Sequence, residues 1–347
     1  MLHKRMFYFP FAALFFLLVF TPLSLSQVSG TCSNCHVLHE SENPVLLKET
    51  CLGCHGQDPT GDLNIVEIEA ARFPQILHSR ADGDLAAGNF RYAADALGGD
   101  YGMGHNVNGL TEQEDPPMDT PPGFIGGVII PGGKGPIEWG SGRRLECAGA
   151  WGCHGNRTIE DPFKSLYGAH HEDDATIDGS TVGKSYRFLY GVTGREHPQW
   201  EYLAATNNHN GYRGDRLLQS TGTISYLCGQ CHAQYHPHEY LGGPEALGVD
   251  AWHRHPAEIS FNDMKNSYRG SEYEAYEIYD LNVPMGFAEP TGEESEIGPD
   301  SVITCLTCHR AHGSPYDNIL RWDYGLVLAG TDHTGPRTGC QVCHSRK

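Results

Sequence analysis

The sequence predicts a loop-rich fold with few short helices and little strand, built around covalently bound groups in place of a large apolar core. Three observations predict it. Gly (43) and Pro (21) together exceed their usual share of a 347-residue chain, which favours turns over long elements. A short pattern of cysteine and histidine recurs along the chain, and all twelve cysteines belong to copies of it.

Five copies of the pattern read Cys-x-x-Cys-His, which is typical of c-type haem attachment. The two thiols form thioethers to the haem vinyl groups, and the adjacent histidine binds the iron. Counting one stretched copy, the chain is predicted to bind six haems c covalently. The cofactor-binding cysteines are Cys32, Cys35, Cys51, Cys54, Cys147, Cys153, Cys228, Cys231, Cys305, Cys308, Cys340 and Cys343. The proximal iron ligands are His36, His55, His154, His232, His309 and His344.

The stretched copy has five residues between Cys147 and Cys153, and small residues such as Gly149 permit them to loop out. A Cys147–Cys153 disulfide without haem is the alternative, because an exported protein allows it. We favour haem, because His154 still follows Cys153 directly. Cys32, Cys35, Cys51 and Cys54 also have the spacing of a zinc site, but a histidine after every second cysteine argues against zinc.

The sixth coordination position of each iron separates electron transfer from chemistry on a small molecule. Of 20 histidines, six lie in the motifs and one in the leader, so thirteen remain for six positions. His39 and His312 each follow a motif histidine by three residues and cannot pass round the same porphyrin, so as ligands they would serve another haem. The alternative is that they are surface residues on the turn after the motif. His236, four residues after His232, invites the same argument.

The other candidate ligands are chosen by their surroundings. His105 lies among glycines that would let the backbone approach a flat ring. At least one of His170 and His171 is expected to ligate, and His255 stands before Pro256 and beside Trp252. The predicted distal set is His39, His105, His171, His236, His255 and His312, with His170 and His209 as alternates. The other histidines, expected at the surface or against propionates, are His78, His197, His238, His253 and His333.

Residues 1–26 have the features of a signal peptide. Lys4 and Arg5 precede an apolar run, and Ser24 and Ser26 fit the positions before a cleavage site. A membrane anchor is the alternative, but the run is shorter than the roughly 18 residues of a span. We therefore expect an exported protein without stable membrane insertion, in which residues 27–347 form a single hexahaem cytochrome c domain. It would be extracellular or at the cell surface, with the periplasm as the alternative.

Composition and local sequence patterns also indicate which partners are excluded and which local structures are expected. Lys plus Arg is 24 and Asp plus Glu is 43, giving a net charge of -19, so nucleic acid is not an expected partner. Residues 66–77 resemble a helix interrupted by Pro74, whereas 221–227 have some β character. Residues 128–130 could form a short strand, and the acidic stretches 271–281 and 289–300 are expected to be solvated loops.

The chain resembles the extracellular multihaem c-type cytochromes of metal-reducing bacteria, of the doubled Cys-x-x-Cys-His kind. The residues that carry the resemblance are 32–39, 99–107, 186–189, 252–256, 305–324 and 340–344. The resemblance implies that His39, His105, the His170–His171 pair, His255 and His312 are distal ligands. Some members of that group polymerise into nanowires, but the stretched motif departs from the usual spelling.

Two functions remain open from the sequence. The first is an electron conduit, not an enzyme, whose partners are other multihaem cytochromes, metal oxides or further copies of itself in a head-to-tail filament. The second is a multihaem reductase of nitrite or a related oxyanion, with one open haem. The surplus of histidine and the absence of Cys-x-x-Cys-Lys favour the conduit.

Overall fold

The computed structural model shows a chain with short elements joined by long loops. The described residues are 30–39, 46–56, 61–68, 71–80, 83–111, 120–124, 143–172, 176–216, 220–232, 235, 257–266, 273, 276–328 and 337–344. The candidate ligands His236 and His255, the expected strand 128–130 and the leader 1–26 lie outside these ranges.

Each described helix has six residues or fewer, which confirms the predicted loop-rich fold. The α-helices are α1 (Cys32–Cys35), α2 (Cys51–His55), α3 (Pro162–Ser165), α4 (Ile224–Gly229), α5 (Phe261–Lys265), α6 (Cys305–Cys308) and α7 (Cys340–Cys343). The described 3-10 turns are η1 (Phe90–Tyr92), η2 (Asp95–Leu97), η3 (Tyr101–Met103), η4 (Ala169–His171), η5 (Tyr186–Phe188), η9 (Asp317–Ile319) and η10 (Tyr324–Leu326). Five of the seven α-helices contain cysteines of a haem motif, so the motif itself determines where these helices form.

The strands are equally short. They are β1 (Ile65–Ile68), β2 (Ala71–Pro74), β3 (Gly194–Arg195), β4 (Gly211–Arg213), β5 (Ile259–Ser260), β6 (Gly286–Phe287) and β7 (Val302–Ile303). β1 and β2 form an antiparallel hairpin, and the other five form a sheet in the order β3-β4-β6-β7-β5. Only the β4–β6 pair is parallel among these described strands.

Three local expectations were wrong. Residues 66–77 form most of the β1–β2 hairpin instead of a helix, because Ile65, Val66 and Ile68 favour a strand. Residues 224–227 begin α4, because the Thr223 hydroxyl accepts a hydrogen bond from Tyr226 N at 3.1 Å and caps the helix. The 271–281 stretch is not wholly solvated, because Tyr276 and Tyr279 are each only 2% exposed.

The apolar side chains form three small clusters in place of one large core. The largest contains Tyr276, Tyr279, Phe261, Met285 and Trp322, and it packs against α7. A second surrounds Tyr186, Tyr212 and Ile224, and a third surrounds Phe90 and Val107.

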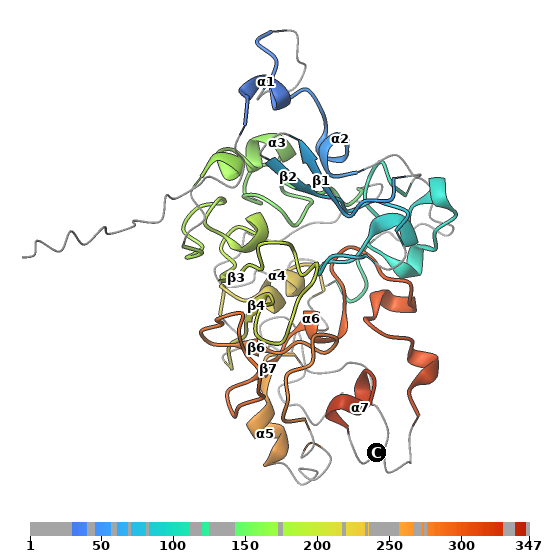
Figure 1. Cartoon of the computed structure of the whole chain (residues 1–347), viewed down its shortest axis with the longest axis vertical. Helices are drawn as coiled ribbons and strands as arrows, with labels where there is room; N and C mark the ends of the chain where they lie inside the picture. Colours follow the sequence, from blue (N-terminus) through green and yellow to red (C-terminus); the bar gives the residue numbers. More distant parts are fainter. Residues whose placement is uncertain are drawn as a thin grey trace, which may run out of the picture.

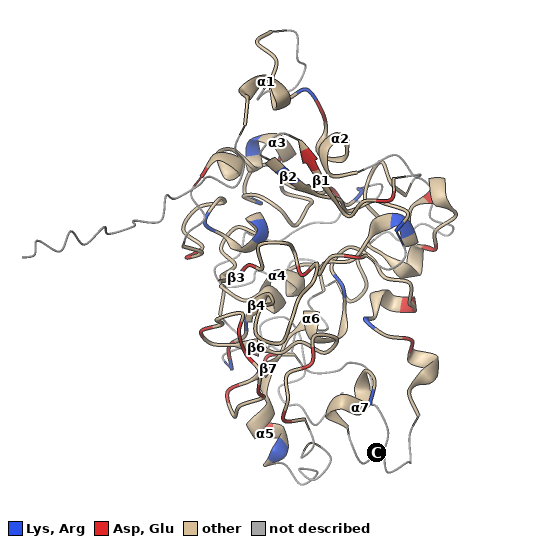
Figure 2. Cartoon of the chain, viewed as in Figure 1, with Lys and Arg blue, Asp and Glu red and all other residues tan. Residues whose placement is uncertain are grey.

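The molecule is elongated, and the motifs are distributed along its length. α1 and α2 lie at one end, and α7 lies near the other, with α4 and α6 between them (Figure 1). Lys and Arg alternate with Asp and Glu along the described part of the chain (Figure 2). Among the described residues, no helix combines the length and apolar character needed to cross a membrane.

Candidate haem sites

Four of the five regular motifs share one backbone contact that brings the histidine back under its first cysteine. The amide N–H of the motif histidine donates to the carbonyl of the first cysteine four residues earlier. The distances are 2.9 Å for His36, 2.9 Å for His232, 3.0 Å for His309 and 2.8 Å for His344. This closure presents both thiols and the imidazole on one side of a single turn.

The stretched motif makes the same contact across its insertion. His154 N donates to Cys147 O at 3.0 Å, and Cys153 N donates to the same carbonyl at 3.3 Å. The extra residues form a turn in which Gly149 has a φ of 85°, a conformation that glycine adopts without strain. Cys147, Cys153 and His154 are therefore arranged as in the regular motifs, and all twelve cysteines are free of disulfides.

The Nδ1 atoms of four motif histidines lie against backbone carbonyls. The distances from Nδ1 are 3.0 Å to Pro74 O in His55, 2.9 Å to Arg187 O in His154, 2.8 Å to Pro122 O in His232 and 2.9 Å to Asn318 O in His309. Nδ1 of each ring is thus occupied by the backbone. A histidine that ligates a metal usually donates its other N–H to such an acceptor. Each of these rings therefore has Nε2 available for iron.

Four motif histidines face a second histidine. The pairs and their ring-centroid distances are His36–His171 at 6.0 Å, His55–His170 at 6.3 Å, His105–His232 at 6.1 Å and His154–His312 at 6.2 Å. A metal–imidazole bond is about 2 Å long, so two imidazoles on opposite sides of one metal have centroids roughly 6 Å apart. The four pairs have this spacing.

Rings in direct contact in the same structure lie closer together. His209 stacks on Tyr279 at 4.3 Å, and Phe90 stacks on His312 at 4.7 Å. The paired histidines are thus separated by a gap that direct stacking would close. No group of three or more metal-binding side chains occurs among the described residues, so the pairs are not parts of a conventional zinc site.

A single continuous cavity of about 1930 Å³ runs past the paired histidines. Ligand pockets usually measure about 300–1000 Å³, so this cavity is large enough for several groups. At least one cysteine from each of five motifs lines it, including Cys35, Cys51, Cys147, Cys228 and Cys305. His105, His170, His171 and His312 line it as well.

Burial lowers the pKa of three of the histidines that face a motif histidine. Together with neighbouring histidines it lowers the pKa of His312 to about 3 and the pKa values of His105 and His170 to about 4. Neutral imidazole is the form that binds a metal. The donors, the gap between paired rings and the cavity all fit haem, which supplies one-electron redox chemistry at its iron when bound.

The sequence-derived ligand candidates divide into three groups. His105, His170, His171 and His312 each face a motif histidine. His39 lies exposed on the turn after α1. His236 and His255 lie outside the described residues.

Three further histidines, His78, His197 and His209, are buried, with exposed fractions of 0%, 3% and 1%. For His78 and His197 the expectation of a surface position was therefore wrong, whereas His209 is one of the alternate ligand candidates. His209 has Nδ1 2.8 Å from Asn210 O and Nε2 3.1 Å from Glu294 O. His197 Nδ1 accepts hydrogen bonds from Gln199 N and Glu201 N, each at 3.1 Å. These two rings contact the protein itself, which gives a physical reason for some of the surplus of histidine.

The backbone of His312 is fixed on both sides. His312 N donates to Ala87 O at 2.7 Å, and His312 O accepts from His105 N at 3.0 Å. The glycines near His105 serve this contact between segments: a Cβ on Gly104 would lie 3.0 Å from His312 O. The glycines near His105 thus allow its backbone to approach the backbone of His312, as well as to lie along the cavity.

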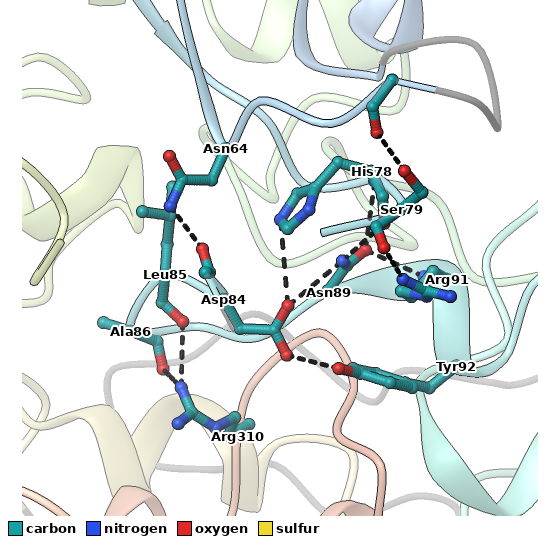
Figure 3. Close-up of polar contacts among 12 residues, drawn as sticks. Asn64, His78, Ser79, Asp84, Leu85, Ala86, Asn89, Arg91, Tyr92 and Arg310 are labelled. Carbon is teal, nitrogen blue, oxygen red and sulfur yellow. Dashed lines mark hydrogen bonds and ion pairs between the residues drawn. The ribbon is translucent and has the colours of Figure 1, made fainter. Parts of the chain in front are cut away.

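The loop that receives His312 is held by a partly buried polar cluster (Figure 3). Asp84 accepts hydrogen bonds from Tyr92 Oη at 2.8 Å and Asn89 Nδ2 at 3.2 Å. Arg310 donates to Leu85 O at 2.9 Å and Ala86 O at 3.1 Å. Arg310 follows His309, so one motif and the loop that positions His312 are connected by direct hydrogen bonds.

Motifs that are consecutive in the sequence are neighbours in space. The neighbouring thiols are Cys35 with Cys54, Cys51 with Cys147, Cys153 with Cys231, Cys228 with Cys305, and Cys308 with Cys340. α4 also packs against α6. The six motifs therefore form one line from α1 to α7.

Repeated Cys-x-x-Cys-His units with opposed histidines define the class of this protein as a multihaem c-type cytochrome. The family model described as the doubled CXXCH motif matches residues 27–60 and 299–347. The curated C-type cytochrome OmcS of Geobacter sulfurreducens is 25% identical over 389 residues, covering 88% of this chain and 82% of that protein. These matches confirm the predicted resemblance.

Two solved structures are also similar to this chain. They are titled as the Outer Membrane Cytochrome S filament and the OmcS nanowires, both from Geobacter sulfurreducens. Their sequence identities are 17% and 18%, and they cover 92% and 93% of this chain and 92% of each matched chain. The TM-score is 0.41 in both cases.

Proposed function

We propose that this protein is a hexahaem electron conduit that delivers electrons to acceptors outside the cell. It is an electron-transfer protein and not an enzyme, as expected of a cytochrome of this class. The observation that supports the conduit best is the set of four opposed histidine pairs along one cavity. An iron with two histidine ligands exchanges electrons without an open position for a substrate.

Six haems are proposed because the stretched motif makes the same closing contact as the regular ones. His154 N reaches Cys147 O at 3.0 Å, within the 2.8–3.0 Å of the regular motifs. The intact mass of the purified protein should equal the polypeptide plus six haems. The Cys147→Ser/Cys153→Ser variant should lose one haem, and a wild-type mass with five haems would refute the assignment.

The proposed ligand pairs follow from the ring geometry. His171, His170, His312 and His105 would complete the irons of His36, His55, His154 and His232 respectively. Because the motifs form a line in chain order, electrons would pass from one terminal motif to the other. Metal oxides and other cytochromes are the proposed acceptors, at the outer surface of the cell.

The His309 site suggests assembly with a second copy of the chain. His309 lines the same cavity and is exposed, but among the described residues no second histidine ring faces it, in contrast to the four pairs. His39 is also exposed, beside Leu38, which is 86% exposed. α1 lies at one end of the molecule, so His39 of one subunit could reach His309 of the next, which would propagate as a filament. The net charge of -19 opposes this contact at low salt.

Carbon monoxide binding tests this assembly. Dispersed wild-type monomers should bind one carbon monoxide more per chain than filaments seen by electron microscopy, because the His309 iron would be open only in the monomer. The His39→Ala variant should bind this additional carbon monoxide under all conditions and form no filaments. Monomers in which no iron binds carbon monoxide would show that the sixth ligand of this iron comes from the same chain.

A further inference from the structure

We infer that Arg187 is a positioning residue for His154, the histidine of the stretched motif. The Arg187 carbonyl oxygen lies 2.9 Å from His154 Nδ1, where it accepts the proton of the ring nitrogen that faces away from the cavity. The inference rests on the proposal that the stretched motif binds haem. It means that a residue outside every motif orients the ring of one iron ligand.

The backbone at Arg187 has a conformation that arginine does not favour. Its φ is 49° and its ψ is 37°, and Phe188 follows with a φ of 60°. In this left-handed region the Cβ atom crowds the carbonyl of the same residue. The conformation turns the Arg187 carbonyl toward His154, and it persists only because other contacts hold it.

The Arg187 side chain supplies those contacts. Its guanidinium donates to Glu196 Oε2 at 3.3 Å, to His197 O at 2.8 Å and to Asn210 Oδ1 at 3.0 Å. The side chain is 21% exposed and that of Glu196 is 14% exposed, so the ion pair is largely shielded from solvent. The strained residue is thereby fixed to the segments around β3 and β4.

A second site in the same molecule shows the turn without this anchor. The Asn318 carbonyl lies 2.9 Å from His309 Nδ1, and Asn318 has a φ of 58° and a ψ of 27°. Asparagine tolerates the left-handed conformation far better than other residues with a side chain. At position 187 arginine adopts the same geometry, and its three polar contacts replace that tolerance.

The hydrogen bond between His154 Nδ1 and Arg187 O should affect the reduction potential of the haem held by the stretched motif. A carbonyl that accepts from Nδ1–H makes Nε2 more basic, which favours the ferric iron and lowers the reduction potential. The positive charge of a guanidinium acts in the opposite direction, since it disfavours the ferric iron. Loss of the hydrogen bond should therefore raise the potential, whereas loss of the charge alone should lower it.

Two substitutions of Arg187 in the full-length holoprotein separate these effects. Arg187→Ala removes the anchor and leaves a residue that disfavours the conformation, so the carbonyl should turn away. Arg187→Asn removes the same charge but tolerates the conformation, so the hydrogen bond should remain. Asn210→Ala, which removes one neutral anchor, should act as Arg187→Ala but less strongly.

Potentiometric titration followed by electron paramagnetic resonance gives the readout. Both variants lack the charge and only Arg187→Asn keeps the hydrogen bond, so one of the six potentials should be higher in Arg187→Ala than in Arg187→Asn. The expected difference is about tenfold in the redox equilibrium constant, or about 59 mV for one electron. Equal potentials in the two variants, or a lower potential in Arg187→Ala than in Arg187→Asn, would overturn the inference. A wild-type mass with five haems would instead refute the six-haem proposal.

Discussion

The ring of His312 faces the ring of His154 at 6.2 Å, although His312 is only three residues from His309 in the sequence. A histidine just after one motif therefore faces the histidine of another. The same short segment carries both His309 and His312, so it brings two haem sites close together. This proximity suits electron exchange between them.

The His312→Ala variant should open one iron. We expect a high-spin component in the electron paramagnetic resonance spectrum and binding of one additional carbon monoxide per chain, because His154 would lose its partner. The His209→Ala variant is the control, since both ring nitrogens of His209 already face carbonyl oxygens. An unchanged spectrum in His312→Ala would show that His312 is not a ligand.

The carboxyl of Glu258 should make stability depend on pH. Glu258 is 4% exposed, and burial raises its pKa from 4.5 to about 7 despite hydrogen bonds from Ser225 and Asp215 N. A raised pKa means that the folded state prefers the protonated form. The contribution of Glu258 to the stability of the folded state is thus complete below about pH 4.5, and it is lost as pH rises through about 7.

The Glu258→Gln variant measures this effect. Since one pKa unit corresponds to about 1.4 kcal/mol, the wild type should lose up to about 3 kcal/mol relative to the variant between these pH values. Thermal midpoints of both proteins across the range give the comparison. If the difference between them does not change with pH, Glu258 does not titrate as stated.

Gly88 should tolerate no side chain. A Cβ at this position would lie 1.9 Å from Gly313 O, and its φ is 87°. Gly88→Ala should therefore lower the free energy of unfolding by more than the about 1–2 kcal/mol of a left-handed residue. It should also disturb His312, which precedes Gly313.

Gly98→Ala is the matched control for this clash. Gly98 has a φ of 68°, but a Cβ there would have no atom within 4 Å. This variant should show only the cost of the left-handed conformation. Equal denaturant midpoints for the two variants would mean that the Gly88 loop moves freely, contrary to its hydrogen bonds with residues 310–313.

Local patterns predicted the parts of the fold that depend on neighbouring residues. The Cys-x-x-Cys-His motifs and the scarcity of long elements follow from spacing and from glycine and proline content. The pairing of His154 with His312 depends on contacts between distant segments, which no local pattern specifies. For the same reason the sequence indicated at least one ligand at His170 and His171, whereas the structure places each ring opposite a different motif.

Surplus histidines were the hardest to place. From the sequence, His78 and His197 are expected at the surface or against propionates and His209 is an alternate ligand, and all three are buried. Their environments form from separate loops, as when His209 stacks on Tyr279 at 4.3 Å. Polarity of the sequence alone did not reveal this packing.

Residues 170 and 171 share one peptide bond, and their rings face His55 and His36 respectively. A displacement of η4 would move both rings together. If both are ligands, a substitution in this turn would alter the first two redox centres at once, so neither can be adjusted alone through its distal side. Independent adjustment would have to come from the proximal side, where His55 has its own acceptor in Pro74 O.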